Sequence, residues 1–231
     1  MIRLKRLECR RVRSLAVLLL ALLSAGGWAA PFVVQVGDSR LALDAPPGFS
    51  DVQATGSPRL LELGEALTSA SNKILLFALE DSDVRRFTVG DSPELRRYAI
   101  IFTSRELQTA RVTMAAFRAM VADATRDLGS APDPKLELRK YLDAEPRGPK
   151  FVAELRKDQD VMSIMQGARL PDPPRSKSEP RYLLSSRTLL LIRGKVLNLA
   201  LYTSQNSQED VDWLRAATLR WIEELQQLNL R

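Results

Sequence analysis

Histidine is absent from this chain of 231 residues, and cysteine occurs once, as Cys9. The lack of histidine removes the commonest general base and the commonest metal ligand of proteins. One cysteine cannot form an intramolecular disulfide, so the core alone must hold the fold. Apolar residues make up 45% of the chain and charged residues 27%. This composition excludes a disordered chain and a collagen-like rod, and the length suits one domain.

The net charge of +6 is concentrated near the N-terminus. Residues 1–29 hold six basic side chains and one acidic side chain, Glu8, and therefore account for +5 of the total. The rest of the chain is nearly neutral. It lacks the broad positive field that attracts a phosphate backbone, so we expect no nucleic-acid partner.

The first 29 residues have the pattern of a secretory signal peptide. Basic residues precede an apolar run from Leu15 to Leu23, and Gly27-Trp28-Ala29 offers small residues for cleavage. We predict cleavage after Ala29, with Ala30 as the alternative. The apolar run is shorter than the roughly 20 residues of a spanning helix, so no membrane span is expected after cleavage. An uncleaved N-terminal anchor is the other interpretation.

Cleavage would remove Cys9 and leave a mature chain without any thiol. Arginine is much commoner than lysine, a bias typical of GC-rich bacterial genomes. We therefore predict a bacterial periplasmic protein with a signal peptide at 1–29 and a single domain at 30–231.

The mature chain alternates between strand and helix patterns. Helices are predicted over 57–67, 113–128 and 207–228, the last opened by a Ser207/Asp210 capping box. Residues 135–150 have no decisive pattern. Short turns between neighbouring strands favour antiparallel pairing, so we predict an α+β fold with helices packed on a mainly antiparallel sheet. Strands are predicted over 32–36, 41–45, 73–79, 97–104, 159–170, 182–192 and 195–203.

The chain opens with a hairpin that ends in Pro46-Pro47-Gly48-Phe49, and it closes with the stretch from Arg193 to Tyr202 followed by an amphipathic helix. These two ends resemble the exported PsbP/Mog1/DcrB-like α+β domains. The resemblance covers about a third of the chain. It implies a non-enzymatic accessory or binding module and transfers no functional residue.

Catalytic motifs are incomplete in this sequence. Gly37-Asp38-Ser39 resembles the first block of GDS-type esterases, but a histidine base is missing and the following residues alternate like a strand. We predict no catalytic site. A carboxylate pair suffices for glycoside hydrolysis, and Glu80, Asp81 and Asp83 follow a predicted central strand, so a carboxylate-based exported hydrolase remains an alternative.

Metal and cofactor motifs are likewise missing. Asp81-x-Asp83, Asp158-x-Asp160 and Asp210-x-Asp212 have carboxylates at suitable spacing, but none has the glycine and distal glutamate of a calcium loop. We therefore predict no metal site and no cofactor.

The segment between the strands predicted at 159–170 and 182–192 is longer than a hairpin requires. Its prolines favour extended conformations that lose little entropy on binding, which suggests a partner-contacting loop, although a tolerated insertion is the plainer interpretation. The candidate contact residues are Pro171, Pro173, Pro174, Arg175, Lys177 and Arg181.

The sequence thus predicts a non-catalytic exported accessory protein with a protein partner in the cell envelope. A carboxylate-based hydrolase and a small-ligand carrier are the alternatives. The pathway, the partner and the oligomeric state are not predicted.

Overall fold

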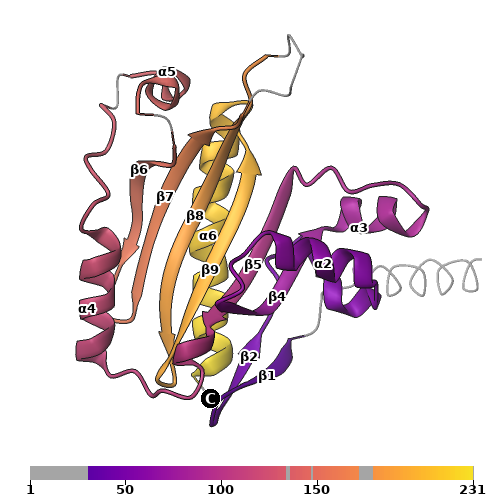
Figure 1. The fold of residues 1–231 in the computed structure, drawn as a ribbon, viewed down its shortest axis with the longest axis vertical. Coiled ribbons are helices and arrows are strands. Elements are labelled where there is room, and N and C mark those ends of the chain that lie inside the picture. Colours follow the sequence, from indigo (N-terminus) through magenta and orange to yellow (C-terminus); the bar gives the residue numbers. More distant parts are fainter. Residues whose placement is uncertain (1–30, 134–135, 147, 172–178, 231) are drawn as a thin grey trace, which may run out of the picture.

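The computed structural model describes residues 31–133, 136–146, 148–171 and 179–230 (Figure 1). Seven strands form one antiparallel sheet in the order β3-β4-β5-β9-β8-β7-β6, and β1 and β2 form a separate hairpin. The strands are β1 (Phe32–Val36), β2 (Ser39–Leu43), β3 (Phe49–Asp51), β4 (Asn72–Glu80), β5 (Arg97–Ser104), β6 (Lys150–Lys157), β7 (Val161–Arg169), β8 (Tyr182–Ile192) and β9 (Lys195–Ser204).

Helices pack on both faces of this sheet, so the predicted α+β class is confirmed. The predicted signal peptide, with Cys9, lies outside the described residues. No helix in the described part of the chain is long and apolar enough to cross a membrane. The helices are α2 (Pro58–Ala66), α3 (Asp81–Thr88), α4 (Met114–Thr125), α5 (Leu138–Asp143) and α6 (Gln208–Asn229), with 3-10 turns η1 (Val52–Thr55) and η2 (Arg105–Leu107).

The hairpin of β8 and β9 is the longest strand pair of the sheet. Its ten paired positions run from Leu183↔Ser204 to Ile192↔Lys195. Arg193 and Gly194 form the turn with φ values of 51° and 77°. Two consecutive positive φ angles give the turn geometry that matches the twist of antiparallel strands, so the sequence Arg-Gly fixes this register.

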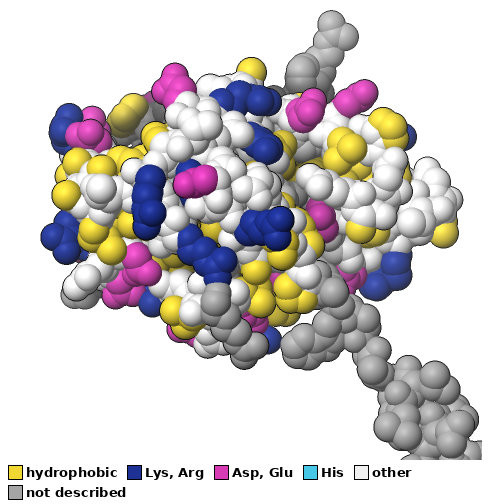
Figure 2. Space-filling model, turned by 90° about the horizontal axis from the view of Figure 1, so that it is seen from below, with side chains coloured by type: hydrophobic (Ala, Val, Ile, Leu, Met, Phe, Trp, Pro, Cys, Tyr) yellow, Lys and Arg dark blue, Asp and Glu magenta, His cyan; other side chains and the backbone are white. Residues whose placement is uncertain are grey.

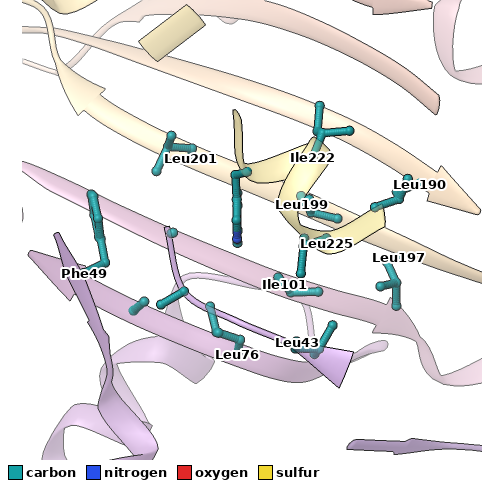
Figure 3. Close-up of a cluster of buried hydrophobic side chains, with 14 of the residues drawn as sticks. Leu43, Phe49, Leu76, Ile101, Leu190, Leu197, Leu199, Leu201, Ile222 and Leu225 are labelled. Carbon is teal, nitrogen blue, oxygen red and sulfur yellow. The ribbon is translucent and has the colours of Figure 1, made fainter. Parts of the chain in front are cut away.

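Helix α6 covers one face of the sheet and runs along β8 and β9 (Figure 1). Its apolar stripe, including Ile222 and Leu225, packs on Leu199 and Leu201 of β9 in the main core (Figure 3). The Trp221 indole N–H donates to the Asp44 carbonyl oxygen at 2.9 Å. This buried stripe joins the hairpin of β1 and β2 and the sheet in one apolar core.

The opposite face is covered by two separate groups of residues. Near β4 and β5, α2 and η1 pack on Phe77 and Ile100. Near the β8–β9 turn, Phe117 of α4 packs on Val196 of β9. The middle of β7, β8 and β9 lies between these two small cores, and none of the helices in the described ranges covers it (Figure 1).

The structure differs from the sequence-based prediction in four places. Residues 81–88, for which no helix was predicted, form α3, in which the buried Asp83 carboxylate accepts hydrogen bonds from the backbone N–H groups of Glu94 and Leu95. Strand β6 was not predicted because two bulges break its alternation. Strand β3 has only three residues, too few to give a pattern. Helix α4 ends at Thr125, short of the predicted Leu128.

A buried lysine at the start of β9, next to the β8–β9 turn, joins three segments of the chain. Lys195 has 1% of its surface exposed, and its ammonium donates to the carbonyl oxygens of Gln108 and Ala110 at 3.1 and 2.9 Å. It also pairs with Asp38 of the β1–β2 turn at 2.8 Å, which lowers the pKa of that carboxyl. A buried ammonium requires such a full set of partners.

Gly37, next to Asp38, offers a test of this junction. Its φ is 58°, and a β-carbon there would collide with the Gln108 carbonyl oxygen and approach the Lys195 ammonium to 2.9 Å. We predict that Gly37→Ala lowers the free energy of unfolding by about 3 kcal/mol or more, measured by urea denaturation.

Gly56→Ala is the matched control. Gly56 has a similar φ of 64° but nothing within 4 Å of a β-carbon, so only the backbone cost of about 1 kcal/mol is expected. Equal losses for the two variants would show that the Gln108 contact is unimportant.

Candidate binding groove on the open sheet face

The register of three strands places a set of side chains on the open face. Across β7, β8 and β9, one row holds Met162, Leu189 and Asn198. The next row holds Ile164, Arg187 and Ala200. Alternate residues of these strands point to the α6 side, as the buried Ser163–Thr188 and Thr218–Ser186 hydrogen bonds show.

These rows form the floor of a groove of about 480 Å³. Its walls come from Ala124 of α4 and Leu128 just after that helix, and from Leu67 and Thr68 of the α2–β4 connection. Ala200 is the smallest side chain of the floor and leaves depth beside its larger neighbours. A concave site of this volume is within the usual range for bound ligands and short segments.

The floor is apolar apart from a few groups with free hydrogen-bonding capacity. Arg187 is exposed, and its one described hydrogen bond is a 3.5 Å contact with the Gln166 side-chain oxygen. Within the part of the chain that the structure describes, neither the Asn198 amide nor the Tyr202 hydroxyl has a hydrogen-bond partner. Among the described residues, the groove lining holds one charged side chain, Arg187, and no carboxylate.

Tyr202 lies at one end of the floor, where its ring stacks on that of Tyr98. The rings of Tyr98 and Tyr202 lie 4.4 Å apart, nearly parallel, in directly paired positions of β5 and β9. Burial raises the pKa of Tyr202, and the nearby Arg187 opposes that rise. The Tyr202 phenol therefore stays a neutral hydrogen-bond donor near neutral pH.

The carboxylates considered for hydrolysis lie at the β4–α3 junction, away from the groove. Asp81 accepts the Ser50 hydroxyl at 2.6 Å, and Asp83 caps the chain at residues 94–95. Burial raises the pKa of Glu80, although Arg97, 3.5 Å away, partly opposes this. Each of the three has a structural partner, and no observation favours a hydrolytic pair.

The other sequence candidates also have plain structural roles. Ser39 is the first residue of β2, and its hydroxyl bonds with Asp38 at 3.2 Å, so it does not begin a helix. No cluster of three potential metal ligands occurs within the described ranges.

Only the ends of the predicted partner-contacting loop can be placed. Pro171 and Arg181 are exposed, and the Leu170 N–H donates to the Arg181 carbonyl oxygen at 2.8 Å. Pro173, Pro174, Arg175 and Lys177 lie outside the described residues. The loop leaves β7 after Arg169 and enters β8 at Tyr182. Its two ends therefore adjoin the same two strands that form part of the groove floor.

The groove was not predicted from the sequence. A signal existed, because Arg187 and Asn198 interrupt long apolar strands. These two residues indicate a groove only when the pairing of β5, β9, β8 and β7 is known. Periodicity along the chain does not give that pairing.

The surface charge has mixed signs on the face of the molecule seen from below in Figure 1. Basic, acidic and hydrophobic side chains are interspersed on the face seen in Figure 2.

A buried ionic network fixes the start of α6 on β5. The Asp210 carboxylate, 3% exposed, accepts the N–H groups of Asn206 and Ser207 and pairs with Arg97 at 3.1 Å. The Arg97 guanidinium also lies 3.9 Å from the Trp213 ring centre. Burial opposes ionisation of Asp210, but these donors outweigh it, so its pKa is lowered.

We predict that Asp210→Asn lowers the free energy of unfolding by about 1–3 kcal/mol at pH 7. Because the pKa of Asp210 is lower in the folded state, its ionised carboxylate stabilises the fold. This contribution is complete above the pKa of an aspartate in the unfolded chain, about 4, and is lost as the pH falls through the pKa of Asp210 in the folded protein. Thermal unfolding from pH 7 to 2 should therefore show a shallower acid decline for Asp210→Asn. Asp212→Asn, on the exposed side of the same turn, is the control, and equal pH profiles for both variants would contradict the network's role.

The chain was compared with known families, curated proteins and solved structures. No protein-family model matches the chain, and no curated protein matches it. The crystal structure of the Saccharomyces cerevisiae Ran-binding protein Mog1p is similar, with a TM-score of 0.34 and 11% identity, over 88% of this chain and 94% of that chain. Mog1p belongs to the group that the two ends of the chain resemble, and a likeness of this extent bears on neither activity nor partner.

Proposed function

We propose that this chain is a non-catalytic accessory protein, exported to the bacterial periplasm, that binds a protein partner through the open face of its sheet. The observation that carries the proposal is the concave groove between α4 and α2, whose lining is mostly apolar. A concave site lined mainly by apolar groups with a few polar ones is characteristic of binding sites.

The groove has the general features of a recognition surface. Met162 and Ile164 supply apolar contact, while Gln166, Asn198 and Tyr202 supply hydrogen-bonding groups around it. An apolar centre with a few polar groups gives affinity and orientation together. All the floor residues lie on strands, so the site is rigid and little order is lost when a partner binds.

Export is supported by the sequence pattern of residues 1–29 and by the lack of any thiol in the remaining chain. A core without disulfides has no requirement for oxidation in the periplasm. The proposed site uses only residues that would remain after cleavage.

Site-specific photo-cross-linking in cells tests the partner site. Ala124 and Ala216 are both exposed alanines on helices, but Ala124 lines the groove and Ala216 lies on α6 at the other face. We predict that p-benzoylphenylalanine at Ala124 yields a discrete adduct with one envelope protein, and that the same residue at Ala216 does not. The captured protein should then bind the purified chain directly. No adduct at Ala124, or equal adducts at both positions, would exclude the groove as the partner site.

Cell fractionation tests the location. We predict recovery in the soluble periplasmic extract with an N-terminus at Ala30 or Pro31, read by terminal sequencing, because the signal pattern ends there. An intact Met1 terminus in the inner-membrane fraction would show an anchor in place of a cleaved signal.

A further inference from the structure

We infer that the groove selects a short apolar segment carrying a carboxylate, which pairs with Arg187. This inference rests on the proposed partner site and adds the chemistry of the bound segment. It starts from the position of Arg187 in the middle of β8, directly paired with Ile164 on one side and with Ala200 on the other.

Arg187 differs from the other arginines of the seven-stranded sheet in having no ion pair. Arg97 pairs with Glu80 and Asp210, Arg156 pairs with Asp158, and Arg169 pairs with Asp143. Within the described ranges, no carboxylate lies within ion-pair distance of Arg187. Three of the four sheet arginines are thus neutralised inside the fold, and the fourth faces the groove.

The groups around Arg187 suit a carboxylate. The Tyr202 hydroxyl and the Asn198 amide can donate hydrogen bonds, and the guanidinium adds a planar set of donors that matches a carboxylate in bidentate geometry. No acidic side chain of the described lining competes for that position. An ammonium-bearing segment would meet only repulsion from Arg187 there.

The apolar side chains of the bound segment would contact an apolar row of the groove next to Arg187. Met162, Leu189 and Phe102 lie in the row next to Arg187, and each contributes to the groove lining. A leucine or similar side chain adjacent to the acidic residue would contact this row. The groove's volume limits entry to a few side chains, and its position between α4 and α2 excludes a flat membrane surface. The occupant is therefore a segment of a protein.

Peptide titration tests the inference. The probes are acetyl-Ala-Leu-Glu-Leu-Ala-amide and its counterparts with Gln or Lys in place of Glu, added to the ¹⁵N-labelled mature protein and followed by NMR. We expect the Glu peptide to bind at least about fivefold more tightly than the Gln peptide, with shifts at residues of β7, β8 and β9, because a charge-assisted bidentate contact exceeds a neutral one. Hexanoate, a free carboxylate with an alkyl chain, is expected to bind more weakly than the Glu peptide.

Arg187→Glu should reverse the preference in favour of the Lys peptide, and Arg187→Gln should abolish the difference between Glu and Gln peptides. Both variants should keep the wild-type melting temperature, since the side chain is exposed. Arg215→Glu makes the same charge change at an exposed position of α6 and should leave all three affinities unchanged. Equal binding of Glu and Gln peptides, no binding of any peptide, or tighter binding of hexanoate would overturn the inference.

The two proposals fail in different ways. If Arg187→Glu leaves the yield of the Ala124 photo-adduct unchanged, the groove is a partner site but the carboxylate pairing is wrong. If the wild-type groove yields no adduct at Ala124, the partner site itself is wrong.

Discussion

The packing of one helix on one face of the sheet is the constraint on which the rest of the structure depends. Helix α6 places its apolar stripe on β8 and β9 and fills that face from the β1–β2 hairpin to β6. Polar groups fix its two ends. Asp210 binds Arg97 at the start, and the Asn229 amide bonds with both backbone groups of Ala42 near the end. Because the helix is held at both ends, the sheet behind it is kept in one register.

The second face then has to be covered by short elements. Helix α2 and η1 cover β4 and β5, and α4 covers the ends of β8 and β9 near their turn. None of these elements is long enough to meet another across the middle of the sheet. The groove is what remains between two small cores, and its floor is as rigid as the strands that form it. The proposed binding surface arises from incomplete coverage of a sheet and requires no separate loop structure.

Much of the fold follows from local patterns, and the parts that do not have identifiable causes. The Arg193-Gly194 turn and the α6 capping residues are short-range signals, so the last hairpin and the last helix were predicted closely. Strand β6 has bulges after Phe151 and after Glu154, which shift the alternation that periodicity depends on. Helix α3 has only eight residues and few apolar ones, so it resembles a charged connection in sequence. The groove itself was missed because Arg187 and Asn198 become neighbours only through the pairing of β8 with β9.

The position of Arg187 also explains how one site can favour one class of partner. In the free protein the guanidinium stays exposed and hydrated, so its charge costs the fold little. A segment that enters the groove removes that water. A neutral segment would leave the Arg187 guanidinium without water or a counter-ion, and its apolar contacts would first have to offset that cost. A segment with a carboxylate compensates for the lost hydration by pairing with the guanidinium. Discrimination therefore comes mainly from the penalty imposed on segments without an acid, and less from extra attraction to those that carry one.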